Sequence, residues 1–291
     1  MGKKKSPGGN FLPMPEAMAM GWARWFRVLE AGLFPPTCTH CGEWMPTGTG
    51  FPDRRPGHSI ALSSPLAATL SRVLCGDCLR DDLRAIEPPF CSVCGIPFRS
   101  RIGDSHPCGR CLEAPGPIGR LRSAGIHRGA LSSVIHDLKY NRRIRLGRRL
   151  GTVLFDVLTT HWLRQELDMV IPVPLHPLRC RQRGFNQSLL MVRPWPRLAA
   201  ERASEWADLT QSADVLVRHQ NTPQQTGLDR RKRRANVRGA FSIRSDRAVR
   251  GKHVLLVDDV LTTGATMDAC ARALLKAGAA SVDGLTVARA L

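Results

Sequence analysis

The residues of this chain with the most specific chemistry lie close together near its C-terminus. Asp258 and Asp259 are adjacent, and three threonines follow them between residues 262 and 266. Carboxylates accept hydrogen bonds from a vicinal diol such as the 2′- and 3′-hydroxyls of ribose, and threonine hydroxyls donate to a phosphate. Gly264 lets the backbone approach a ligand closely and tolerates unusual dihedral angles. This group of residues therefore predicts a site for a sugar 5-phosphate.

The elements that position these residues can be read from the apolar pattern around them. Residues 254–257 form a short unbroken apolar run, which is typical of a strand buried on both faces of a parallel sheet, and we expect it to end at the two aspartates. Apolar residues then recur at helical spacing up to Gly278. A loop that opens a helix offers free backbone N–H groups and the positive end of the helix dipole to a phosphate. The stretch lacks the lysine of a P-loop and the G-x-G-x-x-G spacing of a dinucleotide site.

Residues 254–266, VLLVDDVLTTGAT, resemble the phosphoribosyl pyrophosphate (PRPP) signature of type I phosphoribosyltransferases. The resemblance implies PRPP binding, with Mg²⁺ accompanying the PRPP. The residues that it assigns to this role are Asp258, Asp259, Leu261, Thr262, Thr263, Gly264, Ala265 and Thr266. The alternative is that the aspartates only end a strand in water and the threonines only cap a helix.

An earlier part of the chain predicts the rest of an α/β domain. Residues 121–127 and 169–173 have the pattern of strands, and residues 130–140 and 146–163 have helical spacing. The second strand ends in PVPLH, and the basic stretch 179–187 then predicts a glycine-containing loop before another helix. In an open α/β sheet, ligands bind outside the carboxyl ends of the strands, so this loop could face the one after Asp259.

The resemblance to phosphoribosyltransferases places a pyrophosphate loop after such an early strand. The matching residues are Val173, Pro174, Leu175 and His176, with Arg179 nearby. The alternative for the arginines of this stretch is a solvated basic face.

Eight of the ten cysteines form four C-x-x-C pairs before residue 112. The pairs are Cys38 with Cys41, Cys75 with Cys78, Cys91 with Cys94, and Cys108 with Cys111. Their surroundings repeat, because CTHCG and CGDCL are followed by CSVCG and CGRCL. Two such thiolate pairs complete a tetrahedron around one metal ion. The repeat order predicts two closed, structural zinc sites that join the first pair to the second and the third to the fourth.

The two predicted zinc sites differ in spacing. The second has 13 residues between its pairs, whereas the first has 33, including the Pro-, Gly- and Ser-rich insertion 46–65, which makes its pairing less secure. With eight thiols present, we interpret His40 and His106 as surface residues. Disulfides would need an oxidising compartment, iron–sulfur clusters use tighter cysteine groupings, and redox C-x-x-C pairs need a thioredoxin-like context, so zinc is favoured over all three.

The segment 221–241 is polar and strongly basic. Such a segment can close over a polyphosphate or follow a nucleic-acid backbone. The residues predicted to bind nucleic acid are Arg230, Arg231, Lys232, Arg233, Arg234 and Arg238. Phe241 is the only aromatic residue there, so this segment is poorly equipped to stack on bases.

The composition of the chain limits the kinds of partner and the domain organisation that it can have. The 291 residues are 43% apolar and carry a formal charge of +19, with a pI near 10.7, which favours polyanionic partners. No run of about 18 apolar residues is present, so no membrane span is expected. We predict a basic tail and amphipathic helix over 1–34, a double zinc-ribbon module over 35–114 and a phosphoribosyltransferase-like domain over 115–291. The apolar stretch of the first segment is interrupted at Arg24, which argues against a secretory signal.

The cysteine repeats, followed in order by LKY, PVPLH, RGFNQ, NVRGAF and the PRPP signature, resemble the ComF family of bacterial competence-associated proteins. The resemblance implies an α/β parallel-sheet domain of the type I phosphoribosyltransferase kind, preceded by a zinc-ribbon module, in a cytoplasmic protein. It also implies the handling of incoming single-stranded DNA during natural transformation, with DNA-uptake or recombination proteins as partners. Three functions stay open: a phosphoribosyltransferase with an unknown acceptor, a module that only binds PRPP or DNA phosphates, and a zinc-dependent interaction protein.

Overall fold

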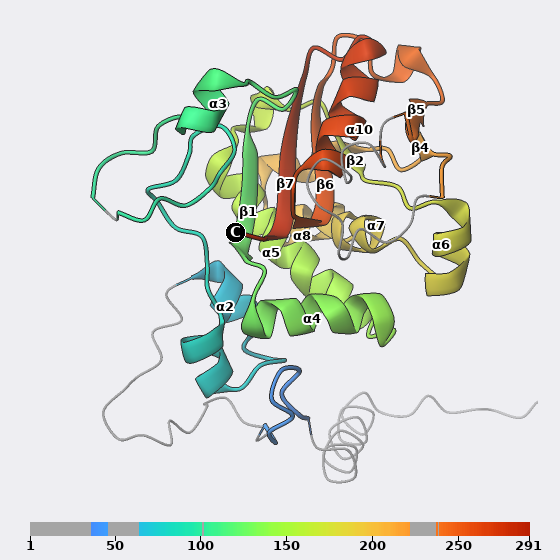
Figure 1. The fold of residues 1–291 in the computed structure, drawn as a ribbon. Helices are drawn as coiled ribbons and strands as arrows, with labels where there is room; N and C mark the ends of the chain where they lie inside the picture. Colours follow the sequence, from blue (N-terminus) through green and yellow to red (C-terminus); the bar gives the residue numbers. More distant parts are fainter. Residues whose placement is uncertain (1–35, 46–63, 101, 222–236, 238) are drawn as a thin grey trace, which may run out of the picture.

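The computed structural model of the chain describes residues 36–45, 64–100, 102–221, 237 and 239–291 (Figure 1). Three predicted features lie outside the described residues: the amphipathic helix, positions 46–63 of the insertion, and the basic nucleic-acid-binding residues named above. Within the described ranges, no helix is both long enough and apolar enough to cross a membrane.

The centre of the fold is a five-stranded sheet in which every pairing is parallel. In spatial order its strands are β1 (Leu121–Ile126), β7 (Ser281–Arg289), β6 (His253–Leu261), β2 (Met169–Pro172) and β3 (Thr210–Gln211). The predicted strands at 121–127 and 169–173 are therefore confirmed. A second, two-stranded antiparallel sheet is formed by β4 (Leu216–Arg218) and β5 (Phe241–Ile243).

The central strand β6 is longer than the sequence predicts. We expected it to end at the two aspartates, but it continues to Leu261, and Asp258 and Asp259 lie within it. The reason is β7, which the apolar pattern did not reveal and which pairs with β6 as far as Leu261 opposite Arg289. The strand pairing fixes the backbone on both sides of the acidic pair.

Burial of β6 on both faces is confirmed. Leu255 and Val257 pack in the core on the side of α4 (Gly129–Tyr140) and α5 (Arg145–His161). Val254 and Leu256 pack in a second core on the side of α10 (Ala265–Lys276). Successive side chains of a strand point to opposite faces, so a continuous apolar run needs two covered faces.

The helices match the predicted pattern except in one place. The predicted helices at 130–140, 146–163 and after Thr266 correspond to α4, α5 and α10. The basic stretch from Arg179 was predicted to be a loop, which is wrong, because its first part is helix α6 (Pro177–Arg183). Pro177 at the first turn suits a helix start, and Gly184 with φ +88° ends it. The helices that follow are α7 (Gln187–Val192) and α8 (Trp195–Glu201).

The described part of the N-terminal region packs on the sheet domain. Leu66 and Leu70 of α2 (Pro65–Leu70) belong to the same core as Leu150 of α5. The short helical turn Cys78–Asp82 lies against α4, and α3 (Gly109–Glu113) begins directly after Cys108 and contains Cys111. The hydrophobic core is therefore continuous from the cysteine-rich region into the sheet domain.

Candidate functional site

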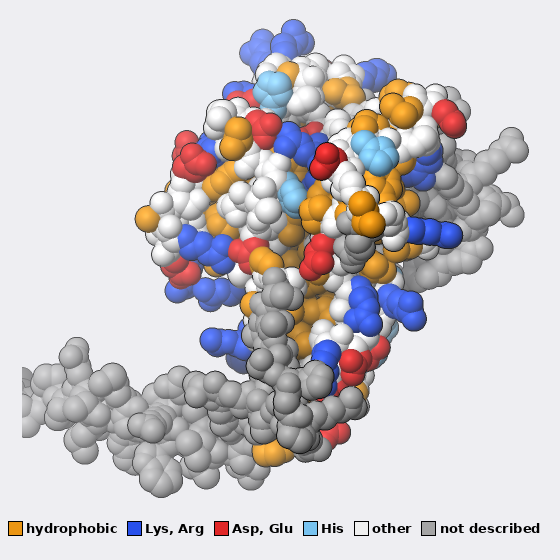
Figure 2. Space-filling model, turned by 90° about the vertical axis from the view of Figure 1, so that its left-hand side faces the viewer, with side chains coloured by type: hydrophobic (Ala, Val, Ile, Leu, Met, Phe, Trp, Pro, Cys, Tyr) orange, Lys and Arg blue, Asp and Glu red, His pale blue; other side chains and the backbone are white. Residues whose placement is uncertain are grey.

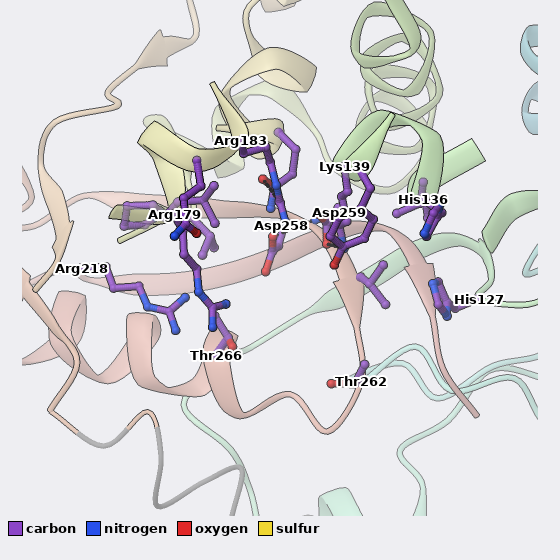
Figure 3. A pocket seen from close by; sticks show the side chains of 18 of the residues that line it. His127, His136, Lys139, Arg179, Arg183, Arg218, Asp258, Asp259, Thr262 and Thr266 are labelled. Atoms are coloured by element: carbon purple, nitrogen blue, oxygen red, sulfur yellow. Dashed lines mark hydrogen bonds and ion pairs between the residues drawn. The ribbon is translucent and has the colours of Figure 1, made fainter. Parts of the chain in front are cut away.

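A cavity of about 650 Å³ lies beside the carboxyl-terminal parts of β2 and β6. Its walls come from α4, the segment after β2, α6, β4 and the end of β6. Figure 3 shows Arg179 and Arg218 at one end, His127 and His136 at the other, and the acidic pair between them. This is the edge of a parallel sheet at which ligands bind, as the sequence predicts.

The two carboxylates of the acidic pair have different surroundings. Oδ1 of Asp258 accepts a hydrogen bond from Ser188 Oγ at 3.0 Å and another from the backbone N–H of Asp259 at 2.9 Å. Asp259 is 4% exposed, and its Oδ1 lies 2.9 Å from Nζ of Lys139. Its Oδ2 is buried and has no hydrogen-bond partner. Buried acceptors are usually satisfied, so this oxygen has capacity for a further donor.

Burial and the neighbouring charge of Asp259 raise the pKa of Asp258 to about 7, although the Asp259 N–H, Lys139 and Ser188 act to lower it. An ionised carboxylate only accepts hydrogen bonds, so a diol bound at Asp258 gains affinity as the pH rises through 7. The folded state holds this proton more tightly than the unfolded state does. The corresponding contribution to folding stability is therefore present at acidic pH and is lost as the pH rises through 7.

Two threonines reach the cavity, one from the segment between β6 and α10 and one from the first turn of α10. Gly264 has φ +81°, a conformation that other residues adopt only with strain, and α10 begins directly after it. Thr262 and Thr266 line the cavity. Thr262, Thr266 and the free backbone N–H groups of the first turn of α10 therefore offer hydrogen-bond donors to the same part of the cavity.

The other members of the predicted PRPP loop have structural roles. Oγ1 of Thr263 accepts a hydrogen bond from the backbone N–H of Ala265 at 3.4 Å and does not line the cavity. Leu261 and Ala265 are buried in the core beneath the loop. The structure thus brings part of the predicted set to the cavity and uses the remainder to shape the turn.

The predicted pyrophosphate loop lies across the cavity from this segment. The backbone N–H of Val173 donates to the carbonyl of Val257 at 2.9 Å, and Nδ2 of Asn186 donates to the carbonyl of Val173 at 3.1 Å. The members of the predicted loop that line the cavity are Val173, Pro174, Leu175 and Arg179. His176 is not among them, because its Nδ1 accepts from the backbone N–H of Leu178 and caps α6.

Four cationic residues of the cavity were not among the predicted site residues: Lys139, Arg142, Arg183 and Arg218. Lys139 lies in the LKY block, but nothing in the sequence around it indicates a binding role. Arg183 also lines the cavity, from α6. Arg218 is only 7% exposed, and its guanidinium lies 5.5 Å from the ring of Phe241. Burial lowers the pKa of Arg218, and the charge of Arg179 lowers it further.

The eight paired cysteines form two clusters, with the pairing that the repeat predicts. One consists of Cys38, Cys41, Cys75 and Cys78, and the other of Cys91, Cys94, Cys108 and Cys111. In each cluster all sulfur atoms lie within 4.8 Å of one another. Sulfur atoms around a tetrahedral zinc ion are about 3.8 Å apart, given Zn–S bonds of about 2.3 Å. The separations include 3.6 Å between Cys41 and Cys75 and 3.8 Å between Cys91 and Cys111, so both clusters fit a metal ion.

Backbone N–H groups surround one thiol of each cluster. The Cys91 sulfur accepts from the N–H groups of Cys94 at 3.3 Å and Cys108 at 3.2 Å. The Cys38 sulfur accepts from the N–H of Cys75 at 3.3 Å. Burial raises the pKa of Cys91, but these N–H groups outweigh it and lower the pKa to about 6. A thiolate is the form that binds a metal.

Each cluster is connected to the sheet domain by side-chain contacts. Arg289, near the end of β7, donates to the carbonyl oxygen of Cys94. Arg122 of β1 donates to the carbonyl oxygen of Ser92 at 3.0 Å. The first cluster contacts α4, because Nδ1 of His40 lies 2.8 Å from Oγ of Ser133.

The two histidines interpreted as surface residues differ in their surroundings. His106 stacks on Phe98 with ring centroids 4.5 Å apart, and it belongs to neither group of four thiols. His40 lies beside Cys78 and Asp82, and the three residues form a further group of potential ligand atoms. Nε2 of His40 is 3.7 Å from Oδ2 of Asp82, so His40 contacts both the helical turn Cys78–Asp82 and, through Ser133, α4.

Comparisons with known proteins agree with this architecture. The profile of the phosphoribosyl transferase domain family matches residues 208–290. The DNA utilization protein YhgH of Escherichia coli O157:H7 is 36% identical over 222 residues, which are 75% of this chain and 91% of that protein. Competence protein F of Haemophilus influenzae is 30% identical over 69% of this chain and 85% of its own length. Competence protein ComFC of Bacillus subtilis is 32% identical over 42% of this chain and 44% of its own length.

A solved structure entitled "Structure of the allosteric regulatory enzyme of purine biosynthesis" aligns with 48% of this chain and 25% of its own, with 20% identity and a TM-score of 0.30. That score is too low to carry an argument. The identities to DNA utilization protein YhgH and to Competence protein F extend over most of both chains. The chain belongs to the ComF family and contains a phosphoribosyltransferase-type domain.

Proposed function

We propose that the cavity binds Mg-PRPP and that the protein takes part in the utilization of single-stranded DNA. The observation that carries the first part is the arrangement of three kinds of groups around one cavity of about 650 Å³. Hydroxyl groups at the start of α10 and just before it, an acidic pair, and two arginines line this cavity. These three kinds of groups complement a ribose that carries a phosphate and a pyrophosphate, because they offer donors to the phosphate, acceptors to the sugar hydroxyls and positive charge to the pyrophosphate.

Each group of the cavity has a role in this binding mode. Thr262, Thr266 and the N–H groups of the first turn of α10 hold the 5-phosphate. Asp258 and Asp259 accept hydrogen bonds from the ribose hydroxyls. Arg179 and Arg218 neutralise the pyrophosphate, and Arg218 is held in place against Phe241.

The metal ion that accompanies PRPP is bound mainly by the ligand in this proposal. Among the described residues, no group of three or more potential metal ligands includes Asp258 or Asp259. Mg²⁺ prefers oxygen ligands and usually retains several waters, and it binds substrate phosphates with one or two protein carboxylates. When bound, Mg²⁺ would neutralise charge on the pyrophosphate.

Thr266→Val tests the phosphate end of this proposal. We expect its affinity for Mg-PRPP to be about ten- to hundred-fold lower, because a hydrogen bond to a charged phosphate is worth about 1.5–3 kcal/mol. Asp259→Asn should cause a loss of similar size through the ribose hydroxyls. Thr159→Val is the matched control, because Thr159 is an exposed helical threonine that does not line the cavity and whose hydroxyl donates to the Asp156 carbonyl. The measurement is titration calorimetry, and equal affinities for Thr266→Val and Thr159→Val would contradict the proposed phosphate site.

The DNA part of the proposal rests on the names of the relatives and on the basic segment 221–241. Figure 2 shows Lys and Arg side chains spread over the visible face among acidic ones, without one continuous basic stripe on the described residues seen from that side. We therefore assign the main electrostatic contact to the basic segment. It binds phosphates without sequence preference, so its affinity falls steeply with salt.

Replacing Arg230, Arg231, Arg233 and Arg234 with Ala should weaken binding of a labelled single-stranded oligonucleotide. The slope of log affinity against log salt should fall by up to about 3, since each lost phosphate contact removes about 0.7. Fluorescence anisotropy between about 50 and 200 mM salt measures this slope. A chain with the exposed Arg193 and Arg197 changed to Ala serves as the control. If the four-residue variant keeps the wild-type slope, the DNA surface lies elsewhere.

Transfer of the phosphoribosyl group to a nitrogen acceptor is the second candidate function. The cavity extends past the acidic pair to His127 and His136, which leaves room for an acceptor beside the sugar (Figure 3). In such a reaction the protein would act mainly by positioning the two reactants and by neutralising the departing pyrophosphate.

A further inference from the structure

The cavity is also lined by a cluster of three flat side chains to which the proposed binding mode of PRPP gives no role. Tyr140, the only tyrosine of the chain, lies at the end of α4 and is 52% exposed. The ring of His136, one helical turn earlier, has its centroid 4.8 Å from that of Tyr140 at an angle of 44°. The guanidinium of Arg183, from α6, lies 5.4 Å from the centroid of the Tyr140 ring. All three residues line the cavity.

These three side chains are held in place by the fold. Residues 136 and 140 are four apart on one helix, so their side chains lie on the same face. Nη1 of Arg183 donates to Oε1 of Gln187 at 2.7 Å, and Gln187 is itself buried. The hydrogen bond to Gln187 therefore holds the Arg183 guanidinium of α6 near the Tyr140 ring of α4. The side chains of α4 and α6, which are distant in sequence, thus lie close together where they line the cavity.

The chemistry of this cluster differs from that of an ordinary apolar patch. Tyrosine, histidine and arginine are the side chains on which proteins stack unpaired bases, because each presents a flat π surface. A polar edge stands beside them, since His127 and Ser132 also line the cavity and Nε2 of His127 lies 3.4 Å from Oγ of Ser132. Burial lowers the pKa of His127, as does the charge of Lys139, so its ring is neutral near pH 7 and offers both a donor and an acceptor.

The position of the cluster gives the cavity two chemically distinct ends. Arg179 and Arg218 lie at one end, His136 and His127 at the other, and the acidic pair stands between them (Figure 3). A ligand that is anionic at one end and aromatic at the other would fill both. We propose that His136, Tyr140 and Arg183 form a subsite that binds an unpaired nucleobase by stacking. This inference rests on the proposed function, because a base held here would stand beside the sugar of PRPP.

The base could come from two sources, a free nucleobase or a base within a single DNA strand, and two ligands distinguish them. The probes are free adenine, measured by calorimetry, and an oligothymidylate containing one 2-aminopurine, measured by its fluorescence. Tyr140→Leu should lower the affinity for at least one of them about tenfold or more, because stacking of one base on an aromatic ring is typically worth that much. Tyr140→Phe should retain wild-type affinity, since it keeps the ring.

Two controls separate stacking from other effects. An abasic strand of the same length should bind wild type and Tyr140→Leu equally, because only phosphates are then contacted. Leu163→Ala removes another exposed apolar side chain, one that does not line the cavity, and should leave both affinities unchanged. Thermal melting of Tyr140→Leu should match wild type, because the ring is half exposed.

A loss confined to the strand identifies DNA as the source of the base, and a loss confined to adenine identifies a free base. Wild-type affinity of Tyr140→Leu for both probes would overturn the subsite, as would an equal loss for the abasic strand or no binding of either probe to the wild type. Mg-PRPP affinity of the same variants is measured in parallel and should not change. If the wild type fails to bind PRPP while Tyr140→Leu still loses base affinity, the PRPP proposal fails and the subsite stands.

Discussion

Cys91→Ser should remove one metal ion per chain and lower the melting temperature by more than ten degrees. Cys91 is fully buried, and its sulfur accepts from two backbone N–H groups that shape both knuckles of the second cluster. Metal binding to a structural four-thiolate site contributes about 10–16 kcal/mol in zinc-finger peptides, so its loss unfolds the region that depends on it. Contacts from Arg122 and Arg289 should spread the loss into the sheet.

The measurement is zinc per chain by atomic emission together with thermal melting. We expect about two zinc ions in wild type and about one in Cys91→Ser. Cys180→Ser is the control, because Cys180 lies on α6 outside both clusters, and it should keep both ions and the wild-type melting temperature. Two ions retained in Cys91→Ser would contradict the second site, and iron in place of zinc would overturn the assignment of the metal.

Lys139→Met should destabilise the protein by about 3–5 kcal/mol. Its Nζ lies 2.9 Å from Oδ1 of Asp259, and the exposed fractions of the two side chains are 18% and 6%. Removing the ammonium leaves a buried carboxylate without its partner, whereas methionine keeps the volume of the stem. The double variant Lys139→Met with Asp259→Asn should recover most of the lost stability, because the unpaired charge is then absent.

Chemical denaturation of the four chains of this double-mutant cycle measures the coupling. Arg143→Met is a control in which an exposed cation loses its ion pair with Asp137, and it should cost about 1 kcal/mol or less. If the single Lys139→Met variant is as stable as the double variant, Lys139 does not hold the charge of Asp259.

The sequence predicted correctly those features that depend on the residue pattern within a single helix, strand or motif. The apolar run of β6 and the helical spacing of α4, α5 and α10 depend only on local periodicity, and each was predicted. Cysteine pairs are equally local, and the order of their repeats was enough to group them correctly. The loops after β2 and β6 were placed at one edge because all parallel strands end there.

The features that the sequence did not predict depend on contacts between distant parts of the chain or on an unusual local structure. β7 escaped prediction because Asp283 and Thr286 interrupt its apolar pattern, although Asp283 accepts a hydrogen bond from Trp162 at 2.7 Å and Thr286 pairs with Ser123 at 2.6 Å. α6 was taken for a loop because it has only seven residues and begins with an unusual histidine cap. Lys139 and Arg218 lie about 120 and 40 residues before the acidic pair, so only the tertiary fold reveals that they share its cavity.

Titration of the wild-type protein with Mg-PRPP at pH 8, where Asp258 is ionised, tests the central claim most directly. The account predicts saturable binding of one PRPP per chain, weaker binding of ribose 5-phosphate or pyrophosphate alone, and a loss of affinity when the titration is repeated at pH 6, because Asp258 has a pKa of about 7. Absence of PRPP binding at millimolar ligand would contradict it, and so would equal affinity for PRPP and for pyrophosphate alone.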